Sequence, residues 1–104
     1  MGYVNEAGYS REEAKQSVGK GWGNLIDILF DAKPEETRVA QVKEKFGGLR
    51  FYVDNADKDY RALVSKIEGL SYSICENCGK LGETSSRGRG WIKTQCKECQ
   101  PVKE

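Results

Sequence analysis

Four cysteines in two pairs have the residue type and spacing best suited to chemistry in this chain. The first pair lies in Cys75-Glu76-Asn77-Cys78 and the second in Cys96-Lys97-Glu98-Cys99, with residues 79–95 between them. A C-x2-C turn directs both thiolates at one tetrahedral centre, and two such pairs at this separation are typical of a four-cysteine zinc ribbon. The sequence therefore predicts a Zn²⁺ ion bound by Cys75, Cys78, Cys96 and Cys99.

Other uses of the four thiols stay open at this stage. Iron in a rubredoxin-like cage is one alternative, which Gln100 disfavours because a glycine is expected after the second pair. Disulfides or a redox switch are another, but a reducing cytosol favours metal over disulfides. Four thiolates leave no open coordination position, so we expect the metal to be structural and its binding energy to support folding.

The chain contains no histidine. Without histidine there is no usual general base at neutral pH, no Cys/His or Ser/His dyad and no usual catalytic zinc ligand. Three acidic residues, Asp54, Asp57 and Asp59, are predicted to be turn and helix-cap residues rather than a cation site. We therefore expect the protein not to be an enzyme.

Two basic clusters are candidates for binding a partner or a nucleic acid. One lies between the cysteine pairs and comprises Arg87, Arg89, Trp91 and Lys93, where cations alternate with an aromatic residue that could stack on a base. The other comprises Lys43, Lys45 and Arg50 around Gly47-Gly48, where a glycine turn beside cations could hold a phosphate or another anion. A solvated surface and a tight turn are the plainer interpretations of the same residues.

Helical patterns account for much of the rest of the chain. Ser10 and Glu13 form a capping box that predicts a short helix as far as Val18. An apolar stripe over Trp22–Ala32, at a spacing of three and four residues, predicts the main core helix. A second stripe predicts a helix over about residues 58–72, which runs almost directly into Cys75.

β-prone segments flank Gly47-Gly48 and predict a hairpin, with the two glycines supplying the positive φ of a primed turn. On the first strand, the alternation places Val42, Glu44 and Phe46 on one face and Lys43 and Lys45 on the other. On the returning strand, Leu49, Phe51 and Val53 lie opposite Arg50 and Tyr52. Residues 83–87 and 91–95 predict a second hairpin between the cysteine pairs.

These elements predict an α+β fold: N-terminal helices, one β-hairpin, an amphipathic helix and a C-terminal zinc ribbon. We expect residues 1–74 to form a small α+β domain and residues 75–104 a ribbon docked on it. The formal net charge of the 104 residues is +1, so nucleic-acid binding would depend on local patches. No apolar stretch approaches the ~20 residues of a membrane span, and the polar N-terminus is unlike a signal peptide, so we expect a cytoplasmic protein.

The strings Val42-Lys43-Glu44-Lys45-Phe46-Gly47-Gly48-Leu49-Arg50-Phe51-Tyr52 and Cys75-Glu76-Asn77-Cys78-Gly79-Lys80 carry a resemblance. Over roughly Trp22 to Cys99, the chain resembles small, mostly uncharacterised bacteriophage and prophage proteins with a helix, a hairpin and a C-terminal cysteine knuckle. The resemblance implies a phage accessory protein that acts in a bacterial host cytoplasm. It implies no activity and no catalytic residues.

Two functional hypotheses follow. The first is a non-catalytic, phage-type accessory protein that binds a host protein or nucleoprotein and inhibits a defence system, in the manner of an anti-CRISPR protein. The alternative is a nucleic-acid-binding zinc-ribbon module. The near-neutral net charge slightly favours the first hypothesis, and the sequence carries no signal for an oligomeric state.

Overall fold

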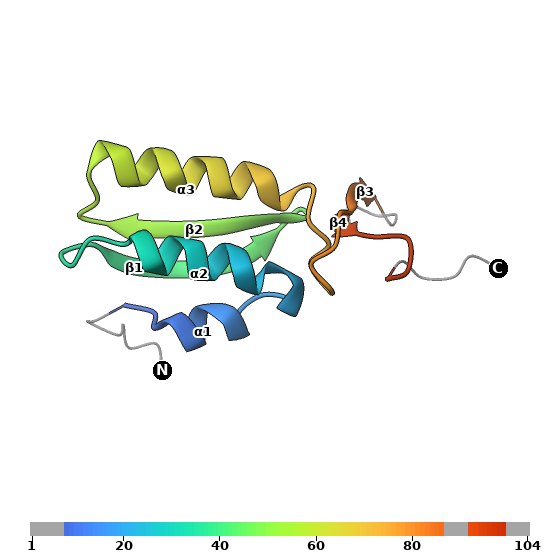
Figure 1. Cartoon of the computed structure of the whole chain (residues 1–104), viewed down its shortest axis with the longest axis horizontal. Helices are drawn as coiled ribbons and strands as arrows, with labels where there is room; N and C mark the ends of the chain where they lie inside the picture. The colour runs from blue at the N-terminus through green and yellow to red at the C-terminus, as the bar shows by residue number, and fades with distance from the viewer. Residues whose placement is uncertain (1–7, 87–91, 100–104) are drawn as a thin grey trace.

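The computed structural model describes residues 8–86 and 92–99, and over these ranges the protein is α+β (Figure 1). Two helices and a first β-hairpin are followed by a long helix and a second, shorter hairpin, as predicted. The elements are α1 (Arg11–Gln16), the 3₁₀ turn η1 (Lys20–Trp22), α2 (Gly23–Ala32), β1 (Arg38–Lys45), β2 (Gly48–Asp54), α3 (Lys58–Ser71), β3 (Glu83–Ser86) and β4 (Ile92–Gln95).

Helix α1 begins at the predicted capping box. The Glu13 amide donates to Ser10 Oγ over 3.1 Å, and the Ser10 amide donates to Glu13 Oε1 over 2.8 Å. The Arg11 guanidinium then forms ion pairs with Asp27 (2.9 Å) and Asp31 (2.8 Å) on α2. These ion pairs are exposed, so they orient α1 on α2 while adding little to stability.

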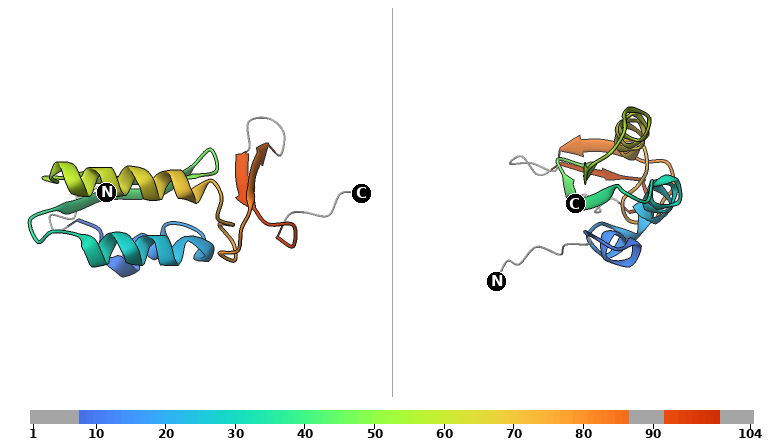
Figure 2. Two further views of the ribbon diagram at one scale, coloured as in Figure 1. Left: turned by 45° about the horizontal axis from the view of Figure 1, so that its top comes forward. Right: turned by 90° about the vertical axis from the view of Figure 1, so that its left-hand side faces the viewer.

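Helices α2 and α3 lie side by side on one face of the β1–β2 hairpin, and the core fills the space between the layers (Figures 1 and 2). Phe51 from β2 meets Phe30 from α2 edge to face, with 5.9 Å between ring centroids. The buried core residues are Ala14, Trp22, Leu25, Ile26, Leu29, Val39, Val42, Leu49, Phe51, Tyr60, Val64 and Ile67. The apolar stripes of the sequence therefore face the core, as predicted.

The turn of the first hairpin differs from its prediction by one residue. Strand pairing closes at Lys45 and Gly48, so the two central residues are Phe46 (φ +54°) and Gly47 (φ +82°) rather than the two glycines. Two positive φ angles are the geometry of a type I′ turn. Gly48 instead begins β2, where a Cβ atom would lie 2.3 Å from the ring of Tyr72.

The shifted turn also changes two predicted side-chain positions. Phe46 was predicted on the face of Val42, but it lies in the turn and its side chain is exposed. Glu44 does share the inner face with Val42, and its carboxylate accepts the Gly47 amide over 2.8 Å. An acidic residue is accommodated on the apolar side because it closes the turn.

The second hairpin stands across the end of the molecule where the first hairpin turns (Figure 2). Its strands contain four residues each, pair from Glu83↔Gln95 to Ser86↔Ile92, and follow α3 through an isolated bridge between Ile74 and Leu81. The described residues contain no helix of the length and apolarity needed to cross a membrane.

Candidate metal centre

The sulfur atoms of Cys75, Cys78, Cys96 and Cys99 all lie within 4.8 Å of one another. Cys78 Sγ and Cys96 Sγ, from different pairs, are 3.5 Å apart. In a tetrahedral site with Zn–S bonds of about 2.3 Å, neighbouring sulfurs are about 3.8 Å apart. The four thiols therefore form a cluster of the size that one tetrahedral ion requires, as the two C-x2-C pairs predicted.

Backbone hydrogen bonds shape both cysteine turns. The Gly79 amide donates to the Cys75 carbonyl over 2.9 Å, and the Cys99 amide donates to the Cys96 carbonyl over 3.1 Å. Gly79 has a φ of +87°, a conformation that glycine adopts without a steric cost. This glycine allows the chain to turn back after Cys78, and the Cys75 amide then donates to the Lys80 carbonyl over 2.7 Å.

The cluster affects the thiol groups unequally. Burial alone would raise the pKa of Cys75, but the amides of Cys96, Cys78 and Asn77 point at its sulfur and lower this pKa to about 6. Hydrogen bonds with the Cys96 and Cys75 sulfurs, together with burial, raise the pKa of Cys99 to about 12. Cys75 therefore carries a negative charge readily, whereas a nearby cation would be needed to hold Cys99 as a thiolate near neutral pH.

The first cysteine turn packs backbone against backbone on the segment before α2. The Gly21 amide donates to the Glu76 carbonyl over 2.9 Å. A Cβ atom on Gly21 would lie only 2.0 Å from the Cys75 carbonyl oxygen and 2.6 Å from the Gly79 nitrogen. The indole of the fully buried Trp22 donates to the Ile74 carbonyl over 2.9 Å. The first cysteine turn is therefore packed directly on the segment before α2 rather than attached by a free linker.

A buried polar network joins the second hairpin to the turn of the first. Thr94 donates its hydroxyl to the Gly47 carbonyl over 2.6 Å and its amide to Glu76 Oε2 over 2.9 Å. The Lys93 ammonium lies 3.5 Å from both Glu44 and Glu76 carboxylates. We call this group of residues, Glu44, Gly47, Glu76, Lys93 and Thr94, the seam.

Lys93 is the one member of the predicted ribbon cluster within the described residues. Its side chain is 25% exposed and lies between the two seam carboxylates, so much of its charge is compensated. Arg87, Arg89 and Trp91 lie outside the described residues. A role of this cluster in binding stays a prediction.

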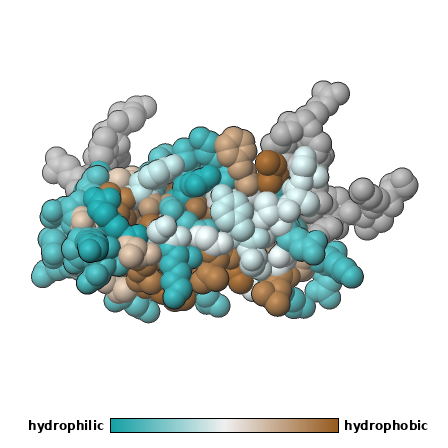
Figure 3. Space-filling view, turned by 90° about the horizontal axis from the view of Figure 1, so that it is seen from above, coloured by the Kyte–Doolittle hydropathy of each residue, from teal (hydrophilic) through white to brown (hydrophobic). Residues whose placement is uncertain are grey.

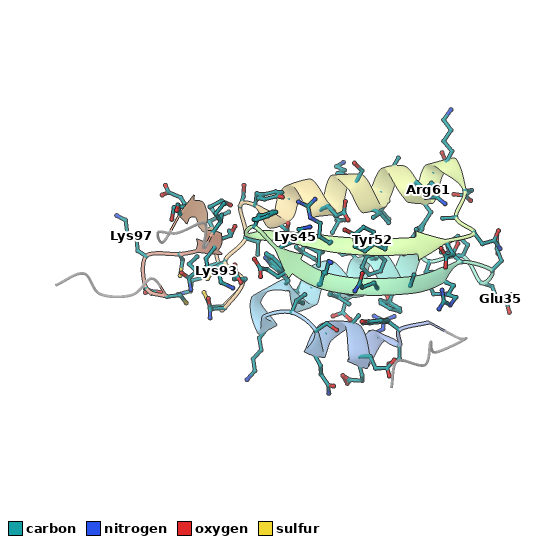
Figure 4. All side chains as sticks on the ribbon, turned by 180° about the vertical axis from the view of Figure 1, so that it is seen from behind. Glu35, Lys45, Tyr52, Arg61, Lys93 and Lys97 are labelled. Atoms are coloured by element: carbon teal, nitrogen blue, oxygen red, sulfur yellow. The ribbon has the colours of Figure 1, made fainter. Side chains whose placement is uncertain are left out.

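The other predicted cluster lies on the face of the first hairpin that α2 and α3 do not cover. Lys43 and Arg50 are directly opposite each other in the strand pairing, and Lys45 pairs with Gly48 beside the turn. Figure 4 views this side of the hairpin and labels Lys45 and Tyr52 on it. We define the open face by the residues Gln41, Lys43, Lys45, Arg50 and Tyr52, with Phe46 at its end.

Two aromatic residues, Tyr52 and Phe46, lie beside the cations of the open face. The Lys43 ammonium lies 5.9 Å from the ring centroid of Tyr52, and the Lys45 ammonium 5.5 Å from that of Phe46. Alternation along β2 predicted Tyr52 on the face of Arg50, as observed, whereas the exposure of Phe46 depends on the turn geometry. On the side seen in Figure 3, above α3, hydrophilic and hydrophobic side chains are interspersed.

No family model, curated protein or solved structure matches this chain.

Proposed function

We propose that the four-thiol cluster binds Zn²⁺ as a structural ion. The sulfur-only donor set, the tetrahedral size of the cluster and the lack of a fifth donor among the described residues support this proposal. Elemental analysis of the purified protein should give one zinc per chain, and Co²⁺ substitution should give the intense visible absorption of tetrahedral tetrathiolate cobalt. A stoichiometric iron content, or intramolecular disulfides in place of bound metal, would contradict it.

We further propose that the protein is a non-catalytic accessory protein of the phage type that binds a host protein or nucleoprotein in the bacterial cytoplasm, as an inhibitor of a defence complex would. The observation that carries this proposal is the open face, which combines three cations and exposed aromatic residues on one side of a hairpin. Exposed aromatic and arginine side chains are the groups that most often dominate binding energy at interfaces.

Affinity capture from bacterial lysate tests this function. The zinc-loaded, tagged protein should retain a defined macromolecular partner, and the double variant K43Q/R50Q should lose most of it. K66Q is a matched control because Lys66 is exposed on α3, away from the hairpin. Mass spectrometry before and after nuclease treatment separates a protein partner from a nucleoprotein. Retention of the same partner by K43Q/R50Q would contradict the assignment of the open face.

The alternative function is a nucleic-acid-binding module centred on the ribbon. The sequence pattern of cations and Trp91 between the cysteine pairs supports this alternative. The ion pairs of Lys93 with Glu44 and Glu76 argue against a role for Lys93 in binding phosphates. Under this alternative, R87Q/R89Q should abolish capture and K43Q/R50Q should leave it intact. The two double variants therefore assign the binding surface directly.

A further inference from the structure

We infer that the open face binds single-stranded nucleic acid, with phosphates held by Lys43, Lys45 and Arg50 and bases stacked on Tyr52 and Phe46. The inference rests on the proposed binding function and names the component of the partner that the open face contacts. Charge, aromatic exposure and backbone geometry each support it.

The charges on this hairpin are paired at one end and left uncompensated at the other. Arg38 and Asp54 lie opposite each other and form an ion pair of 2.7 Å. Lys43 and Arg50 also lie opposite each other, yet both are cations. Like charges in direct cross-strand contact destabilise a hairpin. Within residues 8–86 and 92–99, no carboxylate forms an ion pair with Lys43, Lys45 or Arg50, so this end of the hairpin is complementary to an anion.

The aromatic residues of the open face are exposed without a structural need. Phe46 is 55% exposed and Tyr52 is 45% exposed. Phe46 also occupies a left-handed conformation (φ +54°) that glycine or asparagine adopts at lower cost. Strained residues that contribute nothing to the core are often found at binding sites. A solvent-exposed phenylalanine in this position provides a ring for stacking at the edge of the cationic surface.

The arrangement fits a single strand better than a duplex. Alternate residues on a strand are about 6.6 Å apart, so Lys43 and Lys45 can contact successive phosphates of an extended chain. Unpaired bases can stack on aromatic rings whatever their sequence, whereas the bases of a duplex are already stacked on one another. A base that stacks on Tyr52 or Phe46 takes the place of the nearby ammonium group, which then contacts the phosphate.

Fluorescence anisotropy with labelled oligothymidylate and oligouridylate of about 12 nucleotides tests the inference. The zinc-loaded full chain should bind these probes more tightly than a duplex of equal length, and the affinity should fall steeply with salt. K43Q should lower the slope of log K against log salt by about 0.7, which corresponds to one phosphate contact. K66Q, the control, should leave this slope unchanged.

F46G separates binding from folding. Glycine relieves the left-handed strain, so the melting temperature should stay the same or rise, while affinity for the single strand should fall about tenfold as one stacking platform is lost. Y52A should weaken binding to a similar degree. Unchanged affinity in both variants, or equal affinity for single strand and duplex, would overturn the inference.

Comparison with the lysate experiment distinguishes the two proposals. If the protein captures a nuclease-resistant protein partner through Lys43 and Arg50 but binds neither oligonucleotide, the proposed function stands and this inference fails, because the open face would then meet an acidic protein surface. If neither a partner nor an oligonucleotide is bound, both fail. Binding of the probe that depends on Lys43, Tyr52 and Phe46 supports both.

Discussion

The first hairpin, β1–β2, buries an apolar face that includes Val42, Leu49 and Phe51 under two helices, whereas the second, β3–β4, has strands of four residues each. In the second hairpin, the fully buried inward position is a threonine, Thr94, whose hydroxyl is hydrogen-bonded across the seam. A short two-stranded hairpin is marginally stable on its own. The comparison shows two ways to stabilise the same motif. The first hairpin buries apolar area, whereas the second is connected to the four-thiol cluster and docks on the turn of the first.

Removal of metal should give the largest difference in stability between the two hairpins. Structural zinc contributes on the order of 10 kcal/mol to folding of small modules, so chelation should unfold β3–β4 while α2, α3 and the first hairpin keep much of their structure. Amide hydrogen exchange by NMR would show protection lost at Thr94, whose amide donates to Glu76, but retained at Leu49, whose amide donates to Ser71 Oγ over 2.8 Å. The variant C78S should behave like the chelated protein, and full protection of β3–β4 without metal would refute the comparison.

A core truncation should produce the opposite pattern. Phe51 is almost fully buried against Phe30, so F51A should lower the free energy of unfolding by about 3–5 kcal/mol, measured by urea denaturation. Both hairpins should then be lost together, because the second is docked on the first. Y52A, on the opposite side of the same strand, is the control and should change stability little.

Alkaline pH should destabilise the core through the buried phenol of Tyr60. The Tyr60 hydroxyl donates to the Leu29 carbonyl over 2.6 Å, and burial raises its pKa to about 12. The unfolded chain releases this proton near pH 10, so the folded protein binds more protons between pH 10 and 12 and loses stability across that window. The loss should reach about 2–3 kcal/mol. In Y60F, denaturation titrations over the same range should show a smaller decline.

Two glycines two residues apart give a matched test of docking. G21A places a methyl group 2.0 Å from the Cys75 carbonyl oxygen and should cost about 1–3 kcal/mol or more as the first cysteine turn is displaced. G23A meets no atom within 4 Å in the described structure and lies at the start of α2, so it should stabilise by about 0.5–1 kcal/mol. Equal melting temperatures for the two variants would count against tight docking.

Substitution of Thr94 in the seam should give the smallest loss of stability. T94V removes the hydroxyl that donates to the Gly47 carbonyl and leaves that carbonyl buried without this donor, at a cost of about 1–2 kcal/mol. Local exchange at the β3–β4 amides should rise more than global stability falls. An equal loss of exchange protection in both hairpins would instead show that the seam is part of the main core.

The elements that the sequence predicted well are those defined by local patterns. The stripes of α2 and α3, the capping box of α1 and the cysteine spacing each depend on residues near one another in the chain. The turn at Phe46-Gly47 was missed because Gly48 is required by Tyr72, a contact made through the fold. The ion pairs of Lys93 were missed for the same reason, since Glu44 comes from the other hairpin.

The hydrogen bond from the Trp22 indole to the Ile74 carbonyl spans 52 residues. Trp22, which lies just before α2, is translated 52 residues ahead of Ile74. Until Ile74 emerges, the indole N–H lacks this acceptor and the ring lacks part of its apolar cover. Cys99, the last cysteine of the four-thiol cluster, emerges later still. Assembly of the core and of the four-thiol cluster therefore follows the synthesis of these later segments, and a nascent chain stalled before residue 74 should remain sensitive to protease.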